Sequence, residues 1–422
     1  MGTRTVPLGG VLCGLAVLAL LMYLPALSLP LIADDYIQIS LSREYGHVGG
    51  WANLAADALY RCRATSLLLT HWTELLFGFS PLAFNASSIF LHVLNTFLVF
   101  FLGVWRPIGW KVSLFAAAFF AINERPHEAV MWYAALPELL VFTFVLLTFL
   151  LWILWLQGGS WLYYAGCLLC FLLALASKES AVCLVGFQIV TILVQRVQVT
   201  ARVAQIIPFF ILSVVYFAAI YSARSQHLHF NDGTFSLAAP FAHTMLIATG
   251  RLFWIWGAIA VIAVVCFRLW KLAFIAGAWI VIALLPYSFL TYMPRIPSRH
   301  HYLASVGVAL LVAAAAAAWQ SRGVVPRWAP ALVAALILLH NCSYLWVWKQ
   351  DKFLRRAAPT EDLIRFVENT EGPVYVNCFP YGEEVARLAL RVRTRGKENQ
   401  LIWRTQATGC VSDSAFSSSV LE

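Results

Sequence analysis

Residues 29–40 read LPLIADDYIQIS, and this stretch decides how the rest of the chain is interpreted. A long apolar run that begins near Val6 ends here in two adjacent carboxylates, Asp34 and Asp35. An aspartate costs about 2.5–3.5 kcal/mol at the centre of a membrane helix, so the pair is expected just outside the lipid. Adjacent carboxylates repel unless a cation, a base or a proton shares their site. The alternative is that the two aspartates merely end a helix.

Composition places the whole chain in one class. Of its 422 residues, 61% are hydrophobic and 12% are charged, and the mean hydropathy is +0.77. These values are typical of an all-α polytopic membrane protein and not of a soluble domain. The net charge of +9 is scattered over loop ends, so nucleic acid is not an expected partner. The first apolar run is too long for a signal peptide and is read as an uncleaved first span.

Apolar segments predict about eleven transmembrane helices, most of them near the ~20 residues that a bilayer requires. The segments lie at 6–32, 82–105, 108–122, 137–156, 160–176, 181–195, 205–222, 241–266, 272–290, 301–320 and 328–348. With the N-terminus in the cytoplasm, the even connections carry only basic charge, from Arg106 to Arg327. Every carboxylate before Asp351 then falls in or beside an odd connection, which predicts chemistry on the outer face.

The first outer connection, 33–81, is too long for a turn and has apolar residues at helical spacing. This pattern predicts helices that lie in the membrane interface. Arg61 and Arg63 would sit at headgroup depth, where a planar guanidinium can bind a phosphate through two hydrogen bonds. The alternative for either arginine is an ordinary contact with lipid headgroups.

Three further outer connections carry charge where a span begins or ends. Glu128 and Glu138 lie in the second, where His127 and Glu128 could ligate a metal, although their spacing matches no helical zinc pattern. Lys178 and Glu179 separate two apolar runs in the third, where they either pair with each other or line a cavity. The fifth compresses four basic side chains against the next span and predicts a site for a phosphate, formed by Arg295, Arg299, His300 and His301.

Residues 349–422 are polar and are expected to form a small mixed α/β domain on the outer side of the 1–348 membrane domain. A strand is predicted from Val374 to Phe379, between helical segments at about 358–370 and 382–393. Cys378 and Cys410 both lie in this tail, where an oxidising compartment would permit a disulfide between them.

Several motifs together resemble the GT-C superfamily of polyprenyl-phosphate-sugar-dependent glycosyltransferases. An acidic pair straight after the first span is similar to the start of that fold, and the likeness covers about residues 15–310. FAINERPHEAVMWYAALPELL, ASKESAV and RHHYLASVG resemble motifs of the branch that includes the tetratricopeptide-repeat O-mannosyltransferases. Two departures are the lack of such repeats and the pair His300–His301, where those relatives more often have apolar residues.

The resemblance implies an inverting transfer of a sugar from a polyprenyl-phosphate donor to an acceptor hydroxyl on the outer face. Asp34 would be the general base, while Asp35, Glu128 and Glu138 would orient hydroxyls or hold an optional divalent cation. No cofactor is required. The residues assigned to the donor phosphate are Arg61, Arg63, Lys178, Arg299, His300, His301 and Tyr302.

The implied partners are the lipid-linked donor, membrane lipids and an acceptor that is a glycan, a lipid or a protein. We expect an integral protein of a bacterial inner membrane with its site facing the periplasm. Two alternatives are an enzyme like an O-antigen ligase or polymerase, and a lipid-glycan flippase or other transporter. A transporter should carry charges along its spans, which are almost free of them here.

Overall fold

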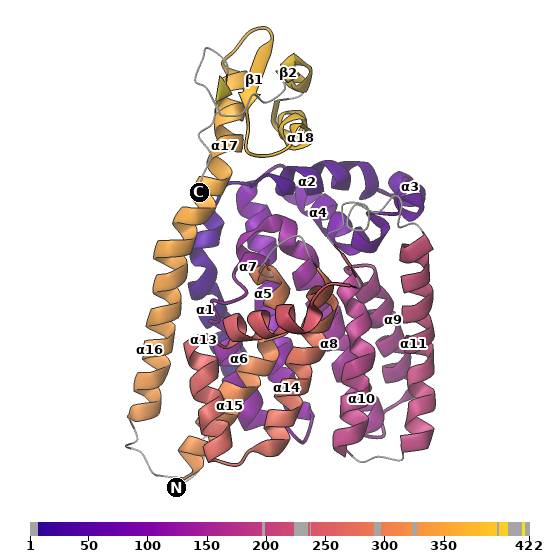
Figure 1. Ribbon diagram of the computed structural model, residues 1–422, viewed down its shortest axis with the longest axis vertical. Helices are drawn as coiled ribbons and strands as arrows, with labels where there is room; N and C mark the ends of the chain where they lie inside the picture. The colour runs from indigo at the N-terminus through magenta and orange to yellow at the C-terminus, as the bar shows by residue number, and fades with distance from the viewer. Residues whose placement is uncertain are drawn as a thin grey trace.

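The fold was analysed in a computed structural model. It describes residues 7–195, 199–222, 235–236, 238–290, 297–322, 326, 328–394, 396–403 and 416–417. Figure 1 shows a bundle of long helices with a small domain standing on one end. Helices α2, α3 and α4 cap that same end of the bundle.

The helices of the bundle and of its cap follow the chain in order. The α-helices are α1 (Leu8–Tyr23), α2 (Asp34–Tyr45), α3 (Trp51–Ala56), α4 (Ala64–Phe77), α5 (Pro81–Phe101), α6 (Gly109–Ala121), α7 (Glu128–Met131), α8 (Leu136–Leu156), α9 (Trp161–Leu175), α10 (Leu184–Gln195), α11 (Val199–Ser222), α13 (Phe241–Cys266), α14 (Trp270–Leu284), α15 (Ser305–Arg322) and α16 (Ala329–Ser343). Short 3-10 helices are η1 (Leu24–Ser28), η2 (Val48–Gly50), η3 (Arg61–Arg63), η4 (Leu102–Val104), η5 (Tyr133–Ala135), η6 (Glu179–Cys183), η7 (Leu285–Phe289) and η8 (Ser298–His301).

The predicted spans are supported in part. Within the described ranges, seven helices are long and apolar enough to cross a membrane: Leu8–Ser28, Pro81–Val104, Tyr133–Leu156, Arg202–Ser222, Phe241–Cys266, Trp270–Phe289 and Ala329–Glu368. The other four predicted segments coincide with shorter apolar helices, Gly109–Ala121, Trp161–Leu175, Glu179–Gln195 and Ser305–Ser321. The chain is thus an integral membrane protein whose short helices fall below the length of a full span.

Helix α8 is the centre of the bundle because apolar residues cover it on every side. A helix that is apolar all round is buried in a large protein or in a membrane, and α8 packs against α5, α9 and α10. Its one ionisable residue, Glu138, lies in its first turn at the capped end. Helix α13 departs from a straight span, because Trp254 has a φ of 45° that breaks it, and part of it crosses the front of the bundle.

The sequence predicted that the last span ends at residue 348, but the structure shows that the helix continues beyond it. Helix α16 continues through a π-helical turn, η9 (Tyr344–Lys349), directly into α17 (Gln350–Glu368). Residues 350–358 are mostly good helix formers, and the helix continues through Pro359. The tail therefore rises from the membrane part on an unbroken helix, which Figure 1 shows in orange to yellow.

The tail contains the predicted strand and a second helix. Its elements are β1 (Val374–Cys378), α18 (Glu383–Thr394), η10 (Lys397–Gln400), β2 (Leu401–Trp403) and β3 (Phe416–Ser417). The strands form a parallel sheet in the order β2-β1-β3, with Val374 opposite Leu401. Cys378 is disulfide-bonded, and Cys410 lies outside the described residues.

The tail is docked on the helix that begins with the acidic pair. The Tyr36 hydroxyl on α2 donates a hydrogen bond of 2.9 Å to Glu361 on α17. Arg393 on α18 lies 3.9 Å from the same carboxylate. Helix α18 also packs directly against α2. These contacts place the tail beside the first outer connection.

The predicted topology can be tested with single cysteines at two exposed positions. We expect Glu44→Cys to react with a membrane-impermeant maleimide added to the outside, and Arg106→Cys to react only after permeabilisation. The reason is that residues 33–81 are predicted outside and Arg106 inside. The parent chain with its native cysteines gives the background. Labelling of both positions from one side would contradict the topology.

Candidate active site

The turn before α2 places the two aspartates in different surroundings, with Asp34 exposed and Asp35 buried. Ala33 has a φ of 32°, a conformation that L-residues rarely adopt and that typically costs about 1–3 kcal/mol. The Asp35 carboxylate holds this turn by accepting hydrogen bonds from the backbone N–H of Ile32 at 2.7 Å and of Ala134 at 2.6 Å. Asp35 is 2% exposed. It therefore ties the first membrane exit to the second outer connection.

Asp34 is exposed, in contrast to its neighbour. Across the part of the chain that the structure describes, no side-chain hydrogen bond or ion pair engages its carboxylate. Partial desolvation by the surrounding protein raises the pKa of Asp34, and the positive charges of Arg299 and Arg356 oppose that rise. A free carboxylate at a membrane exit with a raised pKa is suited to accept a proton.

Burial favours the protonated form of Asp35, which reduces the repulsion expected between the two aspartates. Burial raises the pKa of Asp35 to about 7, although its two backbone hydrogen bonds favour the charged form. The charge of Asp34 raises this pKa further. Near neutral pH the pair therefore carries less than two full negative charges.

Glu128 gathers two arginines from distant segments next to Asp34. Its carboxylate lies 3.9 Å from the Arg299 guanidinium on η8 and 3.8 Å from that of Arg356 on α17. These are ion-pair distances and not hydrogen-bond distances. Burial opposes the ionisation of Glu128, but the positive charges of Arg299 and Arg356 hold its pKa well below the usual value.

The ring of Trp132 packs against the guanidinium groups of both arginines. Their guanidinium carbons lie 4.8 Å (Arg299) and 4.5 Å (Arg356) from the centre of its ring, as cation–π contacts require. The Trp132 Nε1 atom is buried and has no hydrogen-bond partner in the described part of the chain. Such a donor can bond to a ligand that enters the site. The site thus combines two cations, one carboxylate and an unused donor.

Glu138 and Lys178 belong to a separate, closed network. The Lys178 ammonium contacts Glu138, and His300 donates from Nδ1 to the same carboxylate oxygen at 2.5 Å. The second oxygen accepts from the Tyr287 hydroxyl at 2.7 Å. We assign the Nδ1–H tautomer because burial, with help from Lys178, lowers the pKa of His300 to about 3 and a carboxylate can only accept.

This network resolves the alternatives for Lys178. It pairs with Glu138 on α8 and not with the adjacent Glu179, which instead lies 3.6 Å from Arg63. Burial lowers the pKa of Lys178 to about 8, and Glu138 opposes that fall. Glu138 and Lys178 are thus each other's counter-ions, which leaves neither as a free acid, base or phosphate ligand in this arrangement.

The other residues assigned to the donor phosphate lie apart from Asp34 or are engaged elsewhere. Arg61 donates to the Ala219 carbonyl oxygen at 2.7 Å. Arg63 is paired with Glu179.

His301 is buried, and its Nε2 atom has no partner within the described residues. The Tyr302 hydroxyl lies 2.8 Å from Nδ1 of His92 in the helix core. Among the described residues of the predicted set, only Arg299 flanks Asp34 and Glu128, and Arg295 lies outside the described residues.

Sequence reasoning missed Arg356, Trp132 and Tyr381. Arg356 was assigned to the tail, away from the site, and the one signal was the Arg355–Arg356 doublet on an amphipathic helix. The Tyr381 hydroxyl donates to the Arg356 carbonyl oxygen at 2.5 Å. The tail therefore contributes directly to the site.

The described residues contain no group of three or more His, Cys, Asp or Glu side chains that could hold a metal ion. Neither the expectation that no cofactor is required nor the optional divalent cation is tested by this arrangement.

Comparison with solved structures identifies a similar fold. ArnT from Cupriavidus metallidurans bound to undecaprenyl phosphate has a TM-score of 0.55 and 13% sequence identity, over 92% of this chain and 85% of that chain. The fold resembles that of ArnT. The same protein in the apo state gives 0.55 and 13%, over 91% of this chain and 84% of that one.

The likeness to ArnT supports the predicted GT-C fold, and at 13% identity it concerns the fold alone. No protein-family model and no curated protein matches the chain. The narrower resemblance to the O-mannosyltransferase branch stays a prediction.

The closed network predicts a structural role for Lys178. We expect Lys178→Met to lower stability by about 3–5 kcal/mol, because it leaves the buried charge of Glu138 uncompensated. The double variant Lys178→Met/Glu138→Leu should recover part of that loss, because it removes the uncompensated charge but leaves the His300 Nδ1–H without its acceptor. Thermal unfolding in detergent measures both, with exposed Lys352→Met as the control. A single variant of normal stability that has lost affinity for the donor would instead assign Lys178 to the phosphate.

Proposed function

We propose that this protein transfers a sugar from a polyprenyl-phosphate donor to an acceptor hydroxyl, with inversion at the anomeric carbon. The observation that carries the proposal is the free Asp34 carboxylate beside the cationic pair of Arg299 and Arg356. A base and an anion-binding pair side by side at a membrane exit are what this reaction requires. The ArnT-like fold supports a transfer of this type.

Asp34 would act as the general base. It accepts the proton of the acceptor hydroxyl while that oxygen attacks the anomeric carbon, and the bond from that carbon to the phosphate oxygen breaks. Attack opposite the leaving phosphate inverts the anomeric centre. Asp35 would not be a second base, since its carboxylate is occupied by the Ile32 and Ala134 N–H groups. Its role is to position Asp34.

Arg299 and Arg356 would bind the phosphate of the donor and stabilise it as it leaves. A guanidinium presents paired donors to phosphate oxygens, and each charge-assisted hydrogen bond contributes about 1.5–3 kcal/mol. The two groups lie in ion-pair contact with Glu128, which keeps them together when no anion is bound. ArnT, whose structure contains undecaprenyl phosphate, has the same kind of fold, which supports a polyprenyl-linked donor here.

The site would face an oxidising outer compartment, the periplasm of a bacterium. Two features support this orientation: the disulfide-bonded Cys378 in the tail and the basic residues predicted at the opposite end of the bundle. Nucleotide sugars are absent from that side, so a lipid-linked donor is the natural source of the sugar. The acceptor is a glycan, a lipid or a protein.

Loss of the base tests the proposal directly. We expect Asp34→Asn to lower the transfer rate by about 10²–10⁴-fold, because the amide cannot take the proton of the acceptor. The assay supplies purified protein in lipid nanodiscs with a panel of radiolabelled polyprenyl-phosphate hexoses and candidate acceptors. The exposed Asp362→Asn is the control. Wild-type turnover by a folded Asp34→Asn variant would remove this residue from the mechanism.

The pH dependence of the rate gives a second test. Because Asp34 must be ionised and its pKa is raised, kcat/KM should fall on acidification at a pH above the usual range of an aspartate. Arg356 lowers the pKa of Asp34, so Arg356→Gln should move this acid limb to higher pH. The matched control is Arg355→Gln, since Arg355 pairs with Asp351 instead. Identical profiles for both variants would contradict the assignment.

A further inference from the structure

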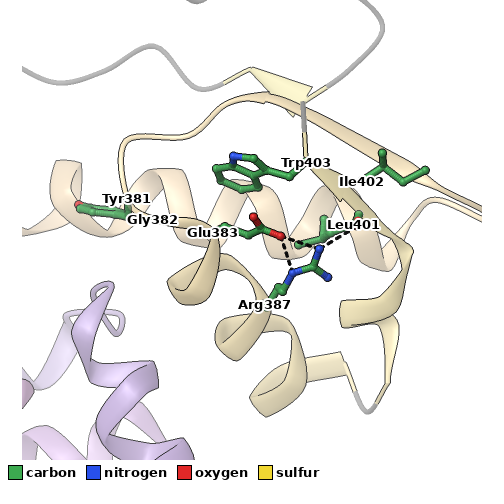
Figure 2. Close-up of a pocket in the computed structure, with 7 residues that line it drawn as sticks. All are labelled: Tyr381, Gly382, Glu383, Arg387, Leu401, Ile402 and Trp403. Carbon is green, nitrogen blue, oxygen red and sulfur yellow. Dashed lines mark hydrogen bonds and ion pairs between the residues drawn. The ribbon is translucent and has the colours of Figure 1, made fainter. Parts of the chain in front are cut away.

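A cleft in the tail is not used by the proposed reaction. It has a volume of about 790 Å³, within the range of about 300–1,000 Å³ that is typical of small-molecule sites. Figure 2 shows the side chains that line it, which come from the loop after β1, the start of α18 and strand β2. The lining side chains include Tyr381, Glu383, Arg387, Leu401 and Trp403.

One side of the cleft is a fixed row of aromatic rings. Trp403 meets Phe379 edge-to-face at 6.3 Å, and Phe379 meets Tyr381 in the same way at 5.6 Å. Phe379 is buried and holds the two outer rings, which are half-buried and face the cleft. Such rings present flat apolar faces whose positions change little on binding.

The opposite side is polar and equally fixed. Arg387 lies 2.6 Å from one oxygen of Glu383, and it donates to the carbonyl oxygens of Glu398 at 3.1 Å and Leu401 at 3.3 Å. In Figure 2 this pair lies below the Trp403 ring. The cleft thus has the Glu383 carboxylate, one oxygen of which Arg387 does not engage, together with an aromatic face.

Tyr381 lies between the cleft and the candidate active site. This residue lines one end of the cleft, and its hydroxyl donates to the Arg356 carbonyl oxygen. Burial raises the pKa of Tyr381, and the charges of Asp34 and Asp35 raise it further, which places the Tyr381 end of the cleft on the side of the aspartates. A ligand held in the cleft would therefore have one end close to the proposed base.

We propose that this cleft binds a saccharide chain that serves as the acceptor. The inference rests on the proposed function and names the acceptor class as a glycan. A pyranose ring has faces of C–H groups, which pack on aromatic rings, and a rim of hydroxyls, which hydrogen-bond to carboxylate and guanidinium groups. The cleft has both kinds of surface, and its Tyr381 end borders the candidate active site at Arg356.

A peptide acceptor fits the same cleft less well. A peptide would add a strand to the edge of the sheet, where β2 is the edge strand. Strand β2 has three residues, and Arg387 already occupies the Leu401 carbonyl oxygen. The edge therefore offers little backbone for a further strand to bind.

The test measures saccharide binding and turnover separately. The full chain in lipid nanodiscs is probed on an array of gluco-, manno-, galacto- and N-acetylglucosamine oligosaccharides and on an array of peptides. We expect binding to a subset of the oligosaccharides that weakens about tenfold or more in Trp403→Ala and in the milder Glu383→Gln. The control is Tyr375→Ala, an exposed aromatic residue on the same sheet that does not line the cleft.

The outcomes distinguish this inference from the proposed function. Saccharide binding that depends on Trp403 supports the cleft even if no sugar transfer occurs. Transfer that requires Asp34, with an acceptor KM unchanged in both cleft variants, overturns the cleft and leaves the proposed function intact. Binding only to peptides, binding to no probe, or saccharide binding equal in the folded cleft variants and the control also overturns it.

Discussion

A single carboxylate, Glu128, connects three segments that are far apart in the sequence. It lies on the second outer connection and is paired with Arg299 before the tenth predicted span and with Arg356 in the tail. Like charges on two arginines would separate these segments, so the negative charge of Glu128 is what allows them to meet. The exposed Asp34 lies within reach of the same two cations. The geometry of the candidate site depends on this one interaction.

The acidic pair shows how one sequence signal conceals two roles. Asp34 and Asp35 look equivalent in the sequence, where only their repulsion can be inferred. In the structure the strained turn at Ala33 directs one side chain outward and the other into the protein. The buried carboxylate then fixes the turn through two backbone N–H groups, and its raised pKa reduces the repulsion. The raised pKa of Asp35 and the nearby cations Arg299 and Arg356 together reduce the repulsion within the pair.

Hydropathy was sufficient to locate the apolar helices, because lipid imposes the same requirement on every span. It did not give their lengths, and four of the eleven segments are shorter than a full span. The hydropathy pattern also did not predict which charged side chains pair with each other. Lys178 was weighed against its neighbour Glu179, yet its partner Glu138 is 40 residues away and approaches only when α8 and η6 pack together. Arg356 was missed because nothing local shows that α17 returns the tail to the first outer connection.

The proposed function requires that Arg299 and Arg356 form a site for a lipid phosphate. Native mass spectrometry of the purified protein with undecaprenyl phosphate measures this most directly, because it requires no knowledge of the sugar or the acceptor. We expect the wild type to retain one undecaprenyl phosphate per chain and a folded Arg299→Gln/Arg356→Gln variant to lose it. Equal retention of undecaprenyl phosphate by the wild type and by this double variant would contradict it.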